Sequence, residues 1–253
     1  MQRSPLFVAV LLVAVHAALA QEAPPPTPTA SPTAALIEKA STGGEQAKTP
    51  DSVTNGTPPP IMAQPTPADT KVETLVFIRH GEKAEPDIGQ LSAQGLNRAL
   101  ALPFVLEKKF GRPDYIYACA TSKKKESKGR EYSYVRPLAT IEPTAIRLGM
   151  TVETKFAFDQ VAALQSELCD PQFREAKIFV VWEHHLLGDL VRRIVKAYGG
   201  DPSEVGDWGK DDFDSILVLK LHTEPGGKRS VVFERDKEGL DDLSTSYPEV
   251  RLP

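Results

Sequence analysis

The sequence predicts an α/β fold, a three-layer α/β/α sandwich in which helices cover both faces of a mostly parallel sheet. Three observations indicate this class. From residue 71 onward, apolar runs of strand length alternate with segments of helical periodicity. The run Ile178–Trp182 is continuously apolar, as in a strand buried on both faces of a parallel sheet. The alternation extends over about 180 residues, a length that suits one domain with a substantial core.

The elements of this domain, residues 71–253, follow in order along the chain. The first strand is expected at 72–78, and Ser92 is expected to cap a helix to about Phe110 that Pro103 interrupts. Further strands are expected at 114–119, 151–156 and 177–182, further helices at 131–148, 159–168 and 186–198, and a final hairpin from 215–221 and 230–234. The lysine-rich segment 120–130 is expected to be a loop that either draws in anionic substrates or is simply solvated.

The residues before this domain have a different character. Residues 1–20 have the pattern of a secretory signal peptide, with Arg3, an apolar stretch from Leu6 to Leu19, and small residues before Gln21. Residues 21–70 contain eleven of the 22 prolines, mixed with Ala, Thr and Ser, and no apolar periodicity. We therefore expect a cleaved signal, with an uncleaved anchor as the alternative, a disordered linker, and a secreted or periplasmic domain without stable membrane insertion.

Charge and cysteine content narrow the classes of partner. The net charge is −4, from 30 basic and 34 acidic residues that are interspersed, so nucleic acid is not an expected partner. The only cysteines, Cys119 and Cys169, are too far apart in sequence for a zinc motif, and they either pair or remain free thiols. The oligomeric state is left open.

A short motif follows the first strand directly. Arg79-His80-Gly81-Glu82 places an arginine, a histidine and a flexible glycine where that strand leaves the sheet. His184 follows the strand at 177–182 and precedes a helix whose free N–H groups would favour an anion. Because parallel strands end at the same edge, both histidines and Arg79 are expected to converge there. This combination is typical of a phosphate site.

The domain resembles the histidine phosphatase superfamily, also called phosphoglycerate mutase-like. The matching motifs, in order, are Arg79–Glu82, Leu91–Gly95 with Arg98, Arg136–Pro143, Trp182–His184 and Phe213-Asp214. The resemblance implies that His80 is a nucleophile that becomes phosphorylated. It also implies that Arg79, Arg136 and His184 bind the phosphate oxygens, without a metal or cofactor.

Each of these roles has a plainer alternative. Arg136 could instead be a helix-surface arginine paired with Glu131 or Glu142. His185 is the alternative to His184, and a metal shared by these neighbouring histidines is not expected because neighbours on a helix do not converge on one ion.

The proton donor to the leaving group is the least defined role. Relatives have an acidic residue shortly after the strand that follows the second helix. Asp159 is nearest to that position, and Glu153 is the second candidate.

Together these observations predict a phosphomonoester hydrolase that acts through phosphohistidine on a small extracytoplasmic substrate. The alternatives are a non-catalytic module that binds a phosphorylated ligand, and a mutase-type phosphoryl transferase. A signal peptide argues against the mutase because it would remove the enzyme from a cytosolic substrate. Two histidines argue against a simple binding module, which needs no nucleophile.

Overall fold

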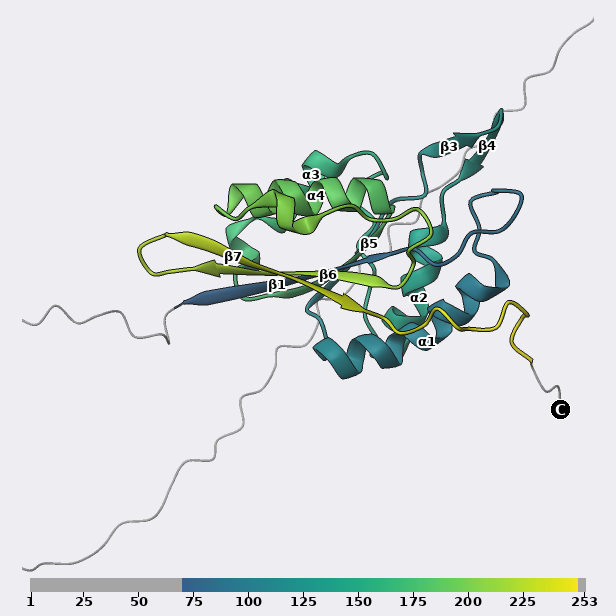
Figure 1. Ribbon diagram of the computed structural model, residues 1–253, viewed down its shortest axis with the longest axis horizontal. Coiled ribbons are helices and arrows are strands. Elements are labelled where there is room, and N and C mark those ends of the chain that lie inside the picture. The colour runs from purple at the N-terminus through teal and green to yellow at the C-terminus, as the bar shows by residue number, and fades with distance from the viewer. Residues whose placement is uncertain (1–69, 250–253) are drawn as a thin grey trace, which may run out of the picture. The chain divides into compact units, whose positions relative to one another are not determined.

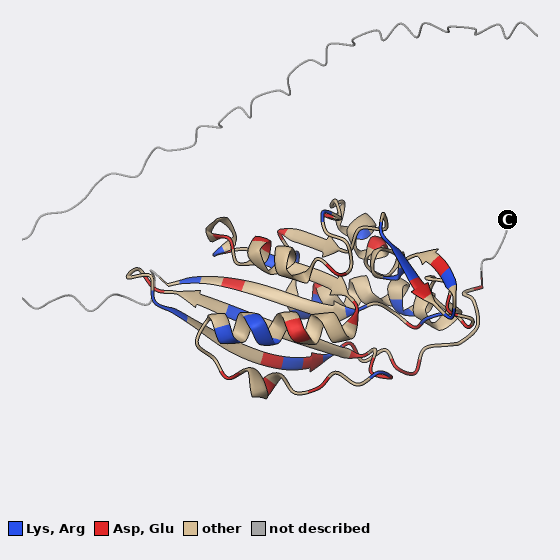
Figure 2. Ribbon diagram, turned by 90° about the horizontal axis from the view of Figure 1, so that it is seen from above, with Lys and Arg blue, Asp and Glu red and all other residues tan. Residues whose placement is uncertain are grey.

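A computed structural model describes residues 70–249 of the chain. The predicted signal peptide and all of the predicted linker except Thr70 lie outside the described residues. In the described part, no helix is both long and apolar enough to cross a bilayer. Acidic and basic residues are interspersed along most of its elements (Figure 2).

A five-stranded sheet forms the middle layer, in the order β2-β5-β1-β6-β7. β1 (Lys71–Arg79) pairs in parallel with β5 (Lys177–Trp182), which pairs in parallel with β2 (Tyr115–Ala118). On its other side β1 pairs with β6 (Ser215–Thr223), which forms an antiparallel hairpin with β7 (Arg229–Lys237). Only β6 therefore runs against the other four strands, and the predicted mostly parallel sheet is confirmed.

Helices cover both faces of this sheet, as predicted (Figure 1). α1 (Ala93–Phe110) and α2 (Arg136–Leu148) pack on one face, and α3 (Val161–Leu168) and α4 (His184–Ala197) pack on the other. Two short 3₁₀ turns, Pro171–Phe173 and Pro202–Val205, follow α3 and α4. Successive residues of β1 enter opposite cores, with Phe77 on the α4 side and Ile78 on the α1 side. Burial on both faces explains the continuously apolar strands.

The second helix begins at Arg136, five residues later than predicted, because the preceding residues form a hairpin. β3 (Lys124–Ser127) pairs with β4 (Arg130–Ser133) where the sequence predicted a loop. Lys128 and Gly129 both have positive φ, 52° and 72°. Positive φ at both turn residues matches the twist of the flanking strands, which closes a two-residue hairpin.

Smaller differences concern element boundaries. Residues 151–156 make no regular strand and contribute an isolated bridge between Glu153 and Tyr117. α3 begins at Val161 rather than Asp159, and α4 begins at His184 rather than Leu186. Cys119 and Cys169 are both free, so the structure contains the unpaired alternative.

Candidate active site

The site lies at the carboxyl ends of β1 and β5, which are neighbouring strands. Arg79 is opposite Trp182 in their register, and the His80 N–H donates to the Trp182 carbonyl at 3.0 Å. α4 begins at His184, two residues after β5 ends. The structure thus places the residues that follow both strands side by side, as the parallel topology predicted.

His80 is buried in a defined tautomer. Its Nδ1 lies 2.7 Å from the Gly81 carbonyl, which can only accept, so Nδ1 carries the hydrogen and Nε2 keeps its lone pair. The imidazole is perpendicular to the Tyr134 ring and tilted against the Phe213 ring, with centroids 5.8 and 6.2 Å away. Burial, reinforced by the positive charge of Arg136, lowers the pKa of His80 to about 3. The ring is therefore neutral near pH 7, as a nitrogen nucleophile must be.

Gly81 and Thr140 hold the turn that carries His80. A Cβ at Gly81 would lie 3.0 Å from the Gly95 carbonyl oxygen, so the glycine permits close packing against α1. Its φ is not positive, so the glycine is needed here for close packing rather than for a left-handed backbone conformation. The Gly81 N–H donates to Thr140 Oγ1 at 2.9 Å, and that hydroxyl donates to the Arg136 carbonyl at 2.8 Å. Thr140 therefore connects the His80 turn to the first residue of α2.

Arg79 is held by a loop that is distant in sequence but adjacent in the fold. Its Nη1 donates to the carbonyls of Lys210 and Asp212 at 2.7 and 2.8 Å, and its guanidinium carbon lies 3.7 Å from the Phe213 ring centroid. Burial lowers its pKa to about 10, although Glu183 opposes the shift. Arg79 is therefore charged at neutral pH and fixed in orientation.

Arg136 is buried at the start of α2 and is not the surface arginine of the alternative interpretation. Its Nη1 donates to Asp87 Oδ1 at 2.6 Å, and its guanidinium carbon lies 4.8 Å from the Tyr134 ring centroid. Burial disfavours its charge, but Tyr134 and Asp87 outweigh burial and raise the pKa of Arg136. Asp87 carries no signal in the sequence, because its position in the 81–90 loop belongs to no motif.

His184 is buried and His185 is exposed, which favours the first histidine at the site. The Glu183 carboxylate caps α4, accepting from the N–H groups of His185 and Leu186 at 3.2 Å each. The expectation that free N–H groups there would hold phosphate is thus wrong for these two groups. Burial alone would raise the pKa of Glu183, but contacts with His184 and with these N–H groups outweigh the effect of burial and lower the pKa to about 2.

Glu183 also lies 2.8 Å from His184 Nδ1, near enough for an ion pair. The approach is off the line that a hydrogen bond requires, and both ring nitrogens of His184 lack a hydrogen-bond partner. Ligand atoms of Glu183, His184 and His185 lie within 4.8 Å of one another, and the two rings are 4.0 Å apart. The expectation that the neighbouring histidines would diverge is therefore wrong.

The predicted phosphate ligands have unsatisfied polar atoms. Among the described residues, eight buried side-chain nitrogen or oxygen atoms have no hydrogen-bond partner, and four of them belong to Arg79, Arg136 and His184. A fifth is the Tyr134 hydroxyl beside them. Buried polar groups in folded proteins are nearly always paired, so this concentration of unpaired atoms makes the cluster the candidate site.

Arg98 and its partner Glu82 are two further positions of the resemblance, and the structure gives Arg98 a supporting role. It is fully buried and forms ion pairs with Glu82 at 2.7 Å and Glu238 at 2.6 Å, and weaker ones with Asp214 and Asp241. The pairing with Glu82 ties the residue after Gly81 to α1. Arg98 therefore stabilises the turn that carries His80 and is not itself part of the candidate site.

The two candidate proton donors lie apart from this cluster. Asp159 is exposed, and its ion pair with Lys123 lowers its pKa. It follows the Ala120–Ala157 bridge, at the carboxyl edge of the sheet. Glu153 forms a backbone β-bridge with Tyr117 of β2, and its Oε2 lies 3.7 Å from Lys155 Nζ. Of the two, Asp159 is nearer to the strand ends.

No protein-family model and no curated protein matches the chain. Solved structures similar to it include a mycobacterial hydrolase (16% identity, 72% of this chain and 94% of that chain, TM-score 0.44). A mycobacterial glucosyl-3-phosphoglycerate phosphatase is 15% identical, over 64% of this chain and 97% of that chain, with a TM-score of 0.45. A phosphoglycerate mutase from Plasmodium falciparum is 12% identical, over 72% and 99%, with a TM-score of 0.42. The chemistry of this chain is inferred from its own residues.

Proposed function

We propose that this protein is a phosphomonoester hydrolase in which His80 is transiently phosphorylated. The observation that carries the proposal is the set of unsatisfied buried atoms on Arg79, Arg136 and His184, grouped around a histidine with a free Nε2. A phosphoryl group has three non-bridging oxygens that accept hydrogen bonds, so it would satisfy these donors.

In the first step, the Nε2 lone pair of His80 attacks phosphorus and the bond to the ester oxygen breaks. The leaving oxygen takes a proton, for which Asp159 is the proposed donor and Glu153 the alternative. Because the ion pair with Lys123 keeps Asp159 ionised, Asp159 donates only after that pair opens and its carboxylate takes up a proton. In the second step, water attacks phosphorus and gives a proton to the carboxylate that donated one in the first step, the P–N bond breaks, and phosphate leaves with His80 restored. Two transfers replace one difficult hydrolysis.

The charges of the site suit this reaction. A neutral imidazole attacks without first losing a proton, and two fixed guanidiniums offset the charge on the phosphoryl oxygens. Because these cations are held by Asp87 and by backbone carbonyls before substrate binds, they need little reorganisation in the transition state. We further propose an extracytoplasmic location, which the signal-like pattern of residues 1–20 supports.

The test is hydrolysis of 4-nitrophenyl phosphate by the purified protein and by its His80→Ala and His222→Ala variants. His222 lies on β6, opposite Val72 near the start of β1, and serves as a matched control. We expect His80→Ala to lose at least about a thousandfold in kcat/KM, while His222→Ala keeps wild-type turnover. Label from a phosphorylated substrate should be trapped as acid-labile phosphohistidine in the wild type and in His222→Ala, but not in His80→Ala.

Two inhibitors complete this test. Vanadate should inhibit, since it forms a five-coordinate species like the transferring phosphoryl group. A chelator should leave the rate unchanged. A loss of activity in the presence of the chelator would show that Glu183, His184 and His185 hold an ion. Undiminished turnover by His80→Ala would refute the nucleophile assignment.

A further inference from the structure

The β3–β4 hairpin has two chemically different faces. In its register Lys125 pairs with Tyr132 and Ser127 pairs with Arg130, so alternation places these four side chains on one face. Tyr132 is buried and Lys125 is half-buried. The opposite face carries Lys124, Glu126 and Glu131, which are all exposed. The face with Lys125 therefore turns toward the domain.

Lys125 reaches the candidate active site. Its Nζ lies 4.6 Å from the Tyr134 ring centroid and 5.4 Å from that of Phe158. Arg136 contacts the same Tyr134 ring at 4.8 Å, and His80 lies at its edge. The ammonium of Lys125, the Arg136 guanidinium and the nucleophile therefore surround one buried aromatic ring.

Lys125 has no carboxylate partner among residues 70–249, unlike its neighbour Lys123, which pairs with Asp159. The aromatic rings offset only part of the cost of removing an ammonium from water. That burial lowers the pKa of Lys125. A half-buried cation that has no counter-ion among the described residues can bind an anionic group of a ligand.

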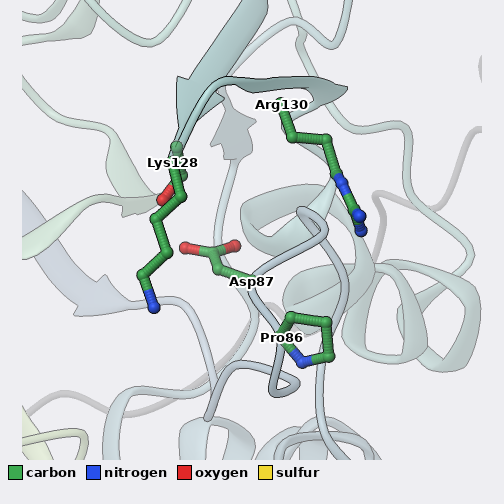
Figure 3. Close-up of a pocket in the computed structure, with 5 residues that line it drawn as sticks. Pro86, Asp87, Lys128 and Arg130 are labelled. Atoms are coloured by element: carbon green, nitrogen blue, oxygen red, sulfur yellow. The ribbon is translucent and has the colours of Figure 1, made fainter.

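A cavity of about 180 Å³ lies between this hairpin and the 81–90 loop, lined by Pro86, Asp87, Ser127, Lys128 and Arg130. Figure 3 shows Lys128 and Arg130 extending from the hairpin toward the loop that carries Pro86 and Asp87. Asp87 is the partner of Arg136, so this cavity adjoins the proposed phosphate site. On the hairpin side this cavity has a basic wall formed by Lys128 and Arg130.

We propose that Lys125 determines substrate specificity by binding a second anionic group, a carboxylate or a second phosphate, on the leaving group. The inference rests on the proposed function, because the first phosphate is taken to lie between His80, Arg79 and Arg136. The substrates favoured by this hairpin are phosphomonoesters whose organic part is itself an anion. Neutral alcohol phosphates would leave Lys125 unpaired.

Binding measured by calorimetry tests this directly. The probes are phenylphosphonate and 3-carboxyphenylphosphonate, which differ by one carboxylate and cannot be hydrolysed. The full chain should bind the carboxylated probe about tenfold more tightly, as a charge-assisted contact in a half-buried site implies. Lys125→Met should reduce this preference to less than about twofold, and Lys125→Arg should restore most of it.

Lys124→Met is the matched control. It removes the same charge one residue away on the outward face, where Lys124 contacts only Ser133 Oγ, at 2.7 Å. It should keep the wild-type preference. Phenylphosphonate affinity in each variant reports whether the site is intact, and Lys125→Gln replaces Lys125→Met if that variant does not fold.

Three outcomes would overturn the inference: no preference in the wild type, equal losses for both probes in Lys125→Met, or the same loss in Lys124→Met. Hydrolysis of phenyl phosphate by the same wild-type sample is scored separately. A protein that shows the preference in binding but no turnover would contradict the proposed function and uphold the role of Lys125.

Discussion

Thr140 offers a sharp test of how the His80 turn is held. Its side chain is fully buried, and its hydroxyl both accepts from the Gly81 N–H and donates to the Arg136 carbonyl. Thr140→Val keeps the shape of the side chain but removes the oxygen. The Gly81 N–H then loses its acceptor in a place that water does not reach.

The expected size of the effect follows from these two bonds. A buried donor left without a partner costs about 1–3 kcal/mol, and the Arg136 carbonyl can still accept from the helix. We therefore expect Thr140→Val to lower the free energy of unfolding by about 2 kcal/mol. In a domain of this size that corresponds to a decrease in Tm of roughly 4–8 °C. Because Gly81 follows the nucleophile, kcat should fall as well, by about tenfold or more.

Thr144 provides the matched control one turn later on α2. It is equally buried, but its hydroxyl has no hydrogen-bond partner. Thr144→Val removes an unsatisfied polar atom and should leave stability unchanged or raise it slightly. Urea unfolding and 4-nitrophenyl phosphate turnover are measured for both variants. Equal stabilities and rates in the two would refute the positioning role of Thr140.

Three further predictions concern titratable groups. Glu73 is 2% exposed and burial raises its pKa to about 8, so its contribution to stability is present below its ordinary pKa and lost as pH rises to about 8. The loss is roughly 1.4 kcal/mol per pH unit between about pH 4.5 and 8, and Glu73→Gln should remove it. Parallel pH dependences of the free energy of unfolding in the two proteins would contradict this prediction. The pH profile of kcat/KM, corrected for substrate ionisation, should lack the limb near pH 6.5 that an ordinary histidine gives, because burial lowers the pKa of His80 to about 3. At high pH, kcat/KM should fall near pH 10 as Arg79 loses its proton. A limb near pH 6.5 that follows His80 would count against its burial. Asp159→Asn should slow alkyl phosphates more than 4-nitrophenyl phosphate, whose leaving group needs no proton; equal effects would point to another acid.

Local features of the sequence were sufficient for the class of fold and for the centre of the site. Strand and helix periodicity is a property of neighbouring residues, and burial on both sheet faces left continuous apolar runs such as 177–182. The motif at Arg79–Glu82 abuts a strand, so topology alone placed it at the ligand-binding edge. His184 was placed at the same edge because it follows the strand at 177–182, whereas Arg136 was found only through the resemblance and the order of its motifs.

Contacts between distant segments decided the rest. Arg136 meets Asp87 across 49 residues, and Arg79 meets the carbonyls of 210 and 212 across more than 130. The strands of the hairpin that carries Lys125 consist mostly of charged residues, so they gave no apolar signal. Their register follows from the backbone of Lys128 and Gly129. Which lysine turns inward depends on that register, and whether a buried atom has a partner depends on the packed neighbours. Local sequence therefore defines the sheet and the residues at its edge, whereas contacts between distant segments set which charges meet there.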